Sequence, residues 1–193
     1  VDNIIGGSRP EDRNVFRSIS VYGNNNILQG NYIGLKPDGL RSQEVGTGIY
    51  LYGSSNRIGG FNSGEGNVIS GCFDGISVHG SDNVIQGNYI GLTASGNYGK
   101  GVGNKYCGIE FNNGSNNIVG GTVNGAGNVI SGNGWAGVAM TSSGTSGQII
   151  QGNFIGTDAS GKFPAGNGGP GVFIYAPSKN NVIGGHEEGS GNL

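Results

Sequence analysis

The string GNYIG occupies residues 30–34 and returns at residues 87–91, and the close variant GNFIG occupies residues 152–156. The related string GNVIS begins at Gly66 and again at Gly127. A second string, of the form N-x-[IV]-G-G, begins at Asn3, Asn56, Asn117 and Asn181. Each of these is followed 11 residues later by another repeat Asn, at Asn14, Asn67, Asn128 and Asn192. Recurrence at regular intervals is the signature of a repeat protein.

A third string, G-[IV]-x-[ILVFM] and its variant at Ser18, divides each long repeat into two units. It begins at Ser18, Gly48, Gly75, Gly108, Gly137 and Gly171. Each unit then holds three short strings in which apolar residues alternate with others, broken by Gly and Asn. Alternation of this kind predicts short strands and no helix. The sequence therefore predicts about six coils, each with three short strands.

The composition fits this reading, because 44 of the 193 residues are Gly and 25 are Asn. Gly at this frequency disfavours helices. Three short strands per coil need sharp corners, and Gly and then Asn tolerate the left-handed backbone angles found there. Asn side chains at matching corners can also hydrogen-bond one another along the stack.

The apolar residues of the strings form three columns that we expect to point inward, where each residue stacks on its counterpart in the next coil. The first column is Ile19, Ile49, Ile76, Ile109, Val138 and Val172. The second is Leu28, Ile58, Ile85, Val119, Ile150 and Ile183. The third is Ile33, Ile69, Ile90, Ile130 and Ile155. A single coil cannot bury its own apolar face, so only stacking creates a core.

These features predict an all-β chain folded as a parallel β-helix, and the resemblance that follows implies that the helix is right-handed. The strings GNYIGLTASG, NNVIGG and GNVISGN resemble the repeats of right-handed parallel β-helix proteins, the pectate-lyase-like superfold, as found in bacterial and archaeal secreted and cell-surface proteins. The resemblance covers nearly the whole chain. It implies the fold and an extracellular or cell-surface setting, but not an activity, because this superfold carries many functions.

Residues 1–193 are expected to form one solenoid. The chain begins and ends in the same phase of the repeat, and neither end carries a polar cap, so we expect a piece of a longer protein. The net charge is −2 and only 11% of the residues are charged, without a basic cluster, which argues against nucleic-acid binding. No apolar run approaches the roughly 20 residues that would span a membrane.

The outward positions of the first strand in each coil, and those just past it, carry aromatic residues. The candidates for carbohydrate contact are Tyr22, Tyr50, Tyr52, His79, Phe173 and Tyr175. Exposed aromatics on a flat ladder are well placed to hold sugar rings. The alternative is that these residues only stack on their neighbours and stabilise the strands.

Four residues on the same face are candidates for catalysis. Tyr52 and His79 stand on successive coils and form a workable acid–base pair for a lyase or epimerase. Asp74 and Glu110 are the plausible carboxylate pair for a glycoside hydrolase. The alternative is surface residues with no shared task. The Asp pairs and the His and Arg/Lys signatures of the polygalacturonase family are not present.

Further apolar residues fall at the second places of the other two strands, where simple alternation would expose them. In the third strand these residues are Tyr32, Val68, Tyr89, Val129 and Phe154. The long connections at 35–47, 92–107 and 157–170 are natural covers for them, and inward packing or a subunit interface are the alternatives.

The two cysteines, Cys72 and Cys107, precede the same strand in adjacent coils. Adjacent coils stand about 4.8 Å apart, within the reach of a disulfide, so the spacing predicts a Cys72–Cys107 bridge and an oxidising environment. The alternative is two unpaired, buried thiols. We expect no cofactor and no metal, although calcium could be held by Asp38 and Asp158 together with backbone carbonyls.

The function that we favour from the sequence is structural or adhesive: an extracellular segment that presents a face for a carbohydrate or a partner. A catalytic site should interrupt a repeat in one place, and no singular polar cluster is evident. The enzymatic alternative is a polysaccharide lyase, epimerase or hydrolase. The third possibility is a filament formed by head-to-tail stacking of copies.

Overall fold

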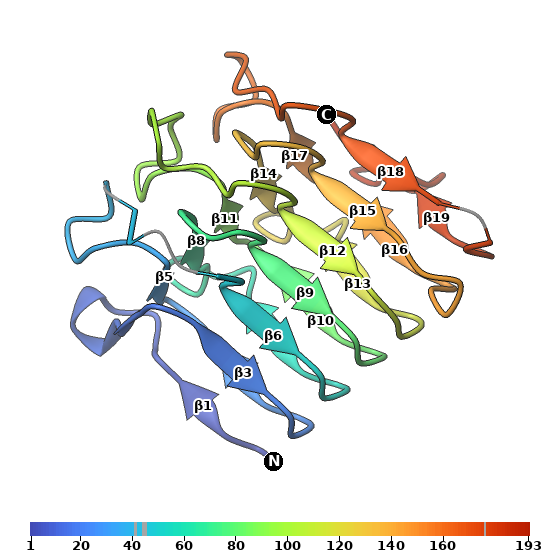
Figure 1. Cartoon of the computed structure of the whole chain (residues 1–193), viewed down its shortest axis with the longest axis horizontal. Coiled ribbons are helices and arrows are strands. Elements are labelled where there is room, and N and C mark those ends of the chain that lie inside the picture. The colour runs from blue at the N-terminus through green and yellow to red at the C-terminus, as the bar shows by residue number, and fades with distance from the viewer. Residues whose placement is uncertain (41, 44–45, 176) are drawn as a thin grey trace.

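The backbone winds into a right-handed parallel β-helix, as the repeat predicts (Figure 1). The computed structural model describes residues 1–40, 42–43, 46–175 and 177–193. Each full coil contributes one strand to each of three parallel sheets, which we call A, B and C. The described residues include no α-helix, and one short 3₁₀ helix spans Pro10–Asp12.

The strands are short, and within a coil the chain runs through sheets C, A and B in that order. Sheet C holds β3 (Ile19–Val21), β6 (Ile49–Leu51), β9 (Ile76–Val78), β12 (Ile109–Phe111), β15 (Val138–Met140) and β18 (Val172–Ile174). Sheet A holds β1 (Ile4–Ile5), β4 (Ile27–Leu28), β7 (Arg57–Gly59), β10 (Val84–Gln86), β13 (Ile118–Gly120), β16 (Ile149–Gln151) and β19 (Val182–Ile183). Sheet B holds β2 (Val15–Phe16), β5 (Tyr32–Ile33), β8 (Val68–Ile69), β11 (Tyr89–Ile90), β14 (Val129–Ile130) and β17 (Phe154–Ile155).

The predicted inward columns form the core of the molecule, except in the end coils, where Ile183 is 45% exposed and Ile19, Ile155 and Val172 are half-buried. Ile49 pairs with Ile76, and Ile76 pairs with Ile109, so each residue lies on its counterpart in the next coil. All three side chains are fully buried. Burial of a whole Ile side chain contributes about 2 kcal/mol, so the columns account for much of the stability.

Asparagine ladders run along the corners, as the composition predicts. Before sheet B, the Asn67 backbone N–H and side-chain amide both donate to Asn88 Oδ1 at 3.0 Å, and Asn88 repeats this with Asn128. A second ladder precedes sheet A, where Gln148 takes the place of an Asn. The amides satisfy the backbone groups that each sharp corner would otherwise leave unpaired.

Two corner positions show why Gly and Asn are needed. Gly30 and Gly87 have φ of 69° and 65°, a conformation that residues with a Cβ rarely adopt. Asn25 has φ of 58° at the corner before sheet A, where the non-glycine residue is tolerated because of its short polar side chain.

Long connections cover part of sheet B, which confirms one of the alternatives raised by the sequence. Leu35 and Val102 come from two such connections and pack on Val68, and Leu92 and Ala165 pack on Val129. Residues 41, 44 and 45 of the first connection lie outside the described part of the chain. Tyr32, Tyr89 and Phe154 are only half-buried, so the cover is incomplete.

The predicted disulfide is wrong, because Cys72 and Cys107 are both free, buried thiols. The register explains the difference. The Cys107 backbone aligns with Asp74, whose carboxylate accepts the Cys107 N–H at 3.0 Å, whereas Cys72 aligns with Lys105. The Cys72 sulfur lies against Gly34 and Gly48, toward the preceding coil, and Cys107 packs on Ala136 and Ala139 of the following coil.

Candidate functional site

The outer face of sheet C carries most of the candidate residues. Tyr22, Tyr52 and His79 occupy one position in three successive coils, just after each strand. The Tyr22 and Tyr52 ring centroids lie 4.7 Å apart with an interplanar angle of 9°, and Tyr52 and His79 also lie 4.7 Å apart. Tyr50 lies parallel to Tyr52 at 6.2 Å. We call Tyr22, Tyr52 and His79 the first aromatic stack.

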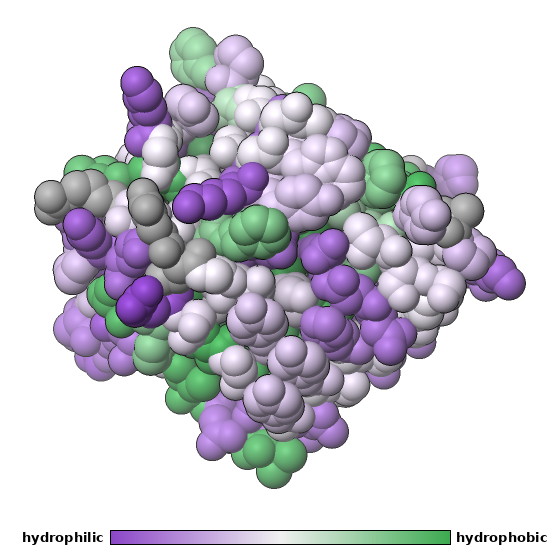
Figure 2. Space-filling model, in the orientation of Figure 1, coloured by the Kyte–Doolittle hydropathy of each residue, from purple (hydrophilic) through white to green (hydrophobic). Residues whose placement is uncertain are grey.

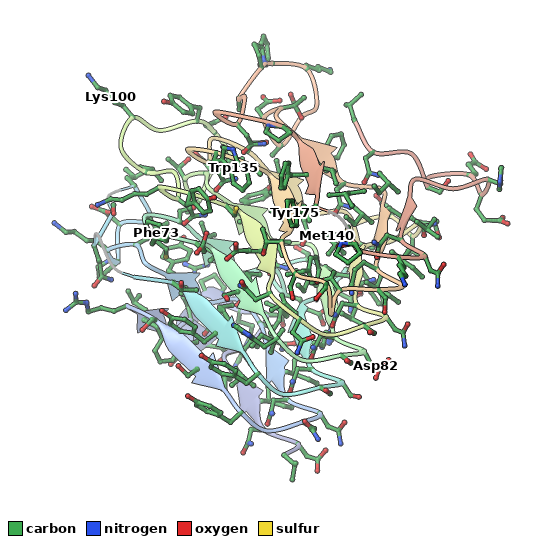
Figure 3. The ribbon with its side chains drawn as sticks, turned by 45° about the vertical axis from the view of Figure 1, so that its right-hand side comes forward. Phe73, Asp82, Lys100, Trp135, Met140 and Tyr175 are labelled. Carbon is green, nitrogen blue, oxygen red and sulfur yellow. The ribbon has the colours of Figure 1, made fainter. Side chains whose placement is uncertain are left out.

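A second aromatic stack, of Phe73, Tyr106 and Trp135, was not anticipated from the sequence. Phe73 and Trp135 lie along the margin where the strands of sheet C begin (Figure 3). The Tyr106 ring lies 5.6 Å from Phe73 and 4.7 Å from Trp135. The signal was available, because each ring stands two residues before the Gly that opens a strand of sheet C.

The geometry of the stacks limits how they can contact a ligand. Rings that stack at 4.7 Å cover one another's faces, so within a stack they present mainly their edges to solvent. A sugar therefore cannot lie flat on most of them. The stacks stabilise the ladder, and phenol hydroxyls at the ring edges remain available for hydrogen bonds.

A polar network continues from His79 of the first aromatic stack through the coils of β9, β12 and β15. Ser77 Oγ lies 3.0 Å from His79 Nε2 and accepts from Asn112 Nδ2 at 3.0 Å. Asn112 Nδ2 also donates to Glu110 Oε2 at 2.9 Å, and Thr141 donates to the other carboxylate oxygen. Figure 2 shows strongly hydrophilic residues gathered in the middle of this face, over these strands. The face thus holds a singular polar cluster, contrary to our expectation from the sequence.

Asp74 lies beside this network and is buried, with 5% of its surface exposed. Burial raises the pKa of Asp74 to about 6, the hydrogen bond from the Cys107 N–H opposes this rise, and the nearby Glu110 carboxylate adds to it. Asp74 therefore holds its proton at mildly acidic pH. Both carboxylate oxygens of Glu110 accept hydrogen bonds within the network.

The structure thus gathers some of the predicted residues and separates others. Tyr22, Tyr50, Tyr52 and His79 form one group, and His79 leads into the network that contains Glu110. Phe173 packs on Trp135 instead, at 4.9 Å with the rings tilted by 57°. Tyr175 is exposed beyond β18, with no ring contact recorded in the described part of the chain.

The charge of this face is unfavourable for binding acidic sugars. Among the described residues, no Lys or Arg is hydrogen-bonded or ion-paired to the network. An enzyme that abstracts a proton from a uronate needs a cation near the sugar carboxylate. The two carboxylates, Asp74 and Glu110, would instead repel an acidic glycan.

The loops considered for calcium use their carboxylates locally. Asp158 accepts from Ser160 Oγ at 2.8 Å and from the backbone N–H groups of Lys162 and Phe163. Asp38 accepts from the Leu40 N–H at 2.9 Å. In the described ranges no three His, Cys, Asp or Glu side chains cluster as metal ligands would. The same ranges contain no helix of the length and apolarity that a membrane crossing requires.

Comparison with family models, with curated proteins and with solved structures found no match. The geometry of the outer faces is therefore what supports a functional assignment.

Proposed function

We propose that the protein is an extracellular or cell-surface β-solenoid that binds a glycan along the outer face of sheet C. The observation that carries this proposal is the polar network of Ser77, His79, Glu110, Asn112 and Thr141, which joins the first aromatic stack at His79. The likeness to pectate-lyase-like β-helix proteins of bacterial and archaeal cell surfaces belongs to the same proposal.

The position of the network supports binding rather than a purely structural role. Elsewhere on sheet C the outward residues differ from coil to coil, as Ser20 and Ala139 do, and no hydrogen bond between their side chains is found among the described residues. In the coils of β9 and β12, neighbouring strands instead place hydroxyl, imidazole, amide and carboxylate groups in one connected set. Such groups are the usual partners of sugar hydroxyls, and a preformed set costs little to order on binding.

The charge of the site selects the class of glycan. Asp74 and Glu110 disfavour uronates and sulfated sugars, so the ligand is a neutral or amino-sugar glycan. The ring edges of the first aromatic stack add contact area, and the tyrosine hydroxyls add hydrogen bonds.

The test is binding of the whole chain to an array of neutral, acidic and amino-sugar glycans, with Glu110→Gln compared. Glutamine keeps the size of Glu110 but replaces one acceptor oxygen by a donor, so affinity should fall about tenfold. Glu187→Gln, on an exposed loop, is the matched control and should bind as the native chain does. Binding confined to acidic glycans, or unaffected by Glu110→Gln, would refute the proposal.

A second candidate is glycan hydrolysis at the same place, and the raised pKa of Asp74 favours it. A carboxyl group that keeps its proton near pH 6 is suited to act as a general acid beside a second carboxylate. New reducing ends from a neutral polysaccharide at pH 5, lost in Asp74→Asn, would establish this activity. Their absence across neutral and amino-sugar polysaccharides would remove it while leaving the binding proposal intact.

A further inference from the structure

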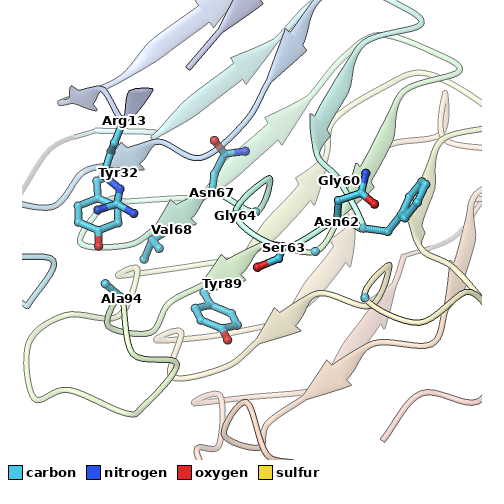
Figure 4. A pocket seen from close by; sticks show the side chains of 14 residues that line it. Arg13, Tyr32, Gly60, Asn62, Ser63, Gly64, Asn67, Val68, Tyr89 and Ala94 are labelled. Carbon is cyan, nitrogen blue, oxygen red and sulfur yellow. The ribbon is translucent and has the colours of Figure 1, made fainter. Parts of the chain in front are cut away.

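A second surface, over sheet B, has the shape of a groove. Two cavities of about 350 Å³ each share Gly87, Tyr89 and Gly125, so together they form one continuous depression, which we call the sheet B groove. It lies on a different side of the solenoid from the sheet C network, and it shares no lining residue with it. Figure 4 shows part of this groove, with Tyr32 and Tyr89 on the same side of the sheet and Val68 between them.

The floor of the groove has a period of two coils. Tyr32, Tyr89 and Phe154 alternate along sheet B with Val68 and Val129, since β8 and β14 lie between their strands. The rings are therefore separated by roughly 9.6 Å, twice the ~4.8 Å between neighbouring strands. They are too far apart to stack on one another. Unlike the rings of sheet C, they do not cover one another's faces.

Both walls of the groove repeat with the same period. On one side the Ala94 N–H donates to Gly39 O at 3.0 Å, and the Ala159 N–H donates to Gly96 O at 3.1 Å, so successive loops bond to each other. Gly96 lies so close to the Tyr89 ring and to Ala159 that a Cβ there would clash. On the other side the loops at 60–66 and 121–127 stack in the same way, with Gly125 against the Phe61 carbonyl.

The groove is almost uncharged. Arg13 is the one charged residue among those that line the two cavities, and its guanidinium sits 4.2 Å above the Tyr32 ring. The nearby Glu65 is paired with Arg57 at 3.1 Å. Neutral polar groups lie along one wall, namely Asn62, Ser63, Thr122 and Asn124.

These features point to one class of occupant. Single-stranded nucleic acid also stacks on aromatic rings, but it needs a positively charged channel, which this groove lacks. An extended peptide repeats its side chains every ~6.7 Å on one face, which does not match the spacing of the rings. A linear sugar chain presents weakly positive C–H groups to the negative face of an aromatic ring, and its disaccharide repeat is close to the two-coil spacing.

We infer that the sheet B groove binds a neutral linear glycan, with successive disaccharide units over Phe154 and Tyr89, while Arg13 covers the Tyr32 ring at one end of the groove. The inference concerns a different surface from the proposed function, and either can hold without the other. The neutral groups of the wall bond the sugar hydroxyls, and the absence of acidic lining residues leaves neutral chains unrepelled.

The test is affinity electrophoresis of the whole chain in gels that contain hydroxyethylcellulose, xylan or galactomannan, with polygalacturonate as the charged comparison. At least one neutral polymer should retard the native chain. Loss of one stacking ring in Tyr89→Ala should weaken retention about tenfold, and Tyr89→Phe should preserve it.

A second pair of variants guards against misfolding of Tyr89→Ala. Ser63→Arg places a long charged side chain on the groove wall, and Ser143→Arg makes the same change on an exposed loop that does not line the groove. Retention should fall in Ser63→Arg and stay native in Ser143→Arg. Three results would overturn the inference: no retention by any of the neutral polymers, equal retention of Ser63→Arg and Ser143→Arg, or loss only in Glu110→Gln. The last would assign the retention to sheet C.

Discussion

The outer face of sheet C and the sheet B groove both present aromatic rings, but at different intervals along the solenoid. On sheet C a ring occurs in every coil of a stack, the rings lie as close as 4.7 Å, and each covers its neighbour. On sheet B a ring occurs in every second coil, with Val68 or Val129 between. The interval therefore decides whether the rings of an aromatic ladder cover one another's faces.

The two surfaces also differ in charge. The sheet C face holds Asp74 and Glu110, whereas the sheet B groove is lined by Arg13 and neutral residues. In a solenoid the interior is nearly the same in every coil, so such differences arise only outside it. Changes at the surface can be compared directly, because the scaffold beneath them is constant.

Replacement of a buried Asn of the ladder should destabilise the scaffold and weaken ligand binding at both surfaces. In Asn88→Leu the backbone N–H and the side-chain amide of Asn67 lose their shared acceptor, and Asn128 Oδ1 and Ile58 O each lose a donor. Since each unsatisfied buried group costs about 1–3 kcal/mol, we expect at least 3 kcal/mol of destabilisation by urea unfolding. Asn113→Leu, on an exposed corner, is the control and should change stability by less than about 0.5 kcal/mol. A loss of binding on one surface alone would show that the scaffold is not shared.

The contributions of Asp74 and Asp158 to the free energy of unfolding should change with pH in opposite directions. The folded pKa of Asp74 is raised from the ordinary 3.8 to about 6, so protonated Asp74 favours folding. Its contribution, about 3 kcal/mol, is full below pH 3.8 and is lost as pH rises through 6. Asp74→Asn should remove this term and make unfolding free energy less dependent on pH between 4.5 and 7.

Asp158, in a loop beside the sheet B groove, provides the opposite case. Burial tends to raise its pKa, but hydrogen bonds from Ser160 and from the Phe163 and Lys162 backbone outweigh this and hold it below the ordinary value. Its contribution is present above that value and is lost as pH falls through the folded pKa. Asp158→Asn should therefore lower stability at neutral pH and not at pH 3. Parallel pH profiles for Asp74→Asn and Asp158→Asn would contradict these assignments.

Loss of a single aromatic ring should change stability less than loss of a buried ladder amide, and by an amount that depends on whether the ring is stacked. Tyr52 stacks on both Tyr22 and His79, so Tyr52→Leu should cost about 1–2 kcal/mol. Tyr89 has no ring partner recorded in the described part of the chain, so Tyr89→Leu should cost less in stability while it weakens retention by neutral glycans. Calorimetry on both variants gives the comparison, and a greater loss for Tyr89→Leu would mean that its ring serves mainly as packing.

The smallest effect on stability is expected from addition of a reducing agent. Cys72 and Cys107 are free thiols. Burial raises the pKa of each thiol to about 12, and the negative charge of the nearby Asp74 adds to this rise. A reducing agent should leave Tm unchanged, and a thiol reagent at pH 8 should react with both groups only after unfolding. A drop in Tm on reduction would restore the disulfide prediction.

The repeat was sufficient to predict the coils, the inward columns and the amide ladders, because each depends on residues at fixed places in every unit. Ile49, Ile76 and Ile109 could be aligned by spacing alone. The disulfide failed for a related reason: Cys72 and Cys107 differ by two residues in their offset from the strand, and this shift separates their side chains.

The outer surfaces were less predictable. Glu110 and His79 could be placed on one face, but their link through Ser77 and Asn112 depends on side-chain conformations that spacing does not determine. The groove depends on loops of irregular length that meet only in three dimensions. Its rings could be identified as a column, yet whether Tyr89 was covered or open could not be predicted from the sequence.

The most direct test of the contrast between the two surfaces is a single set of binding profiles. The native chain, Glu110→Gln and Tyr89→Ala would be measured against the same glycan array and the same neutral polysaccharides. We predict two separable losses, with Glu110→Gln losing array glycans but retaining neutral polymers and Tyr89→Ala showing the reverse. Identical profiles for the two variants, whether both lose the same ligands or neither loses any, would contradict the assignment of separate roles to sheets C and B.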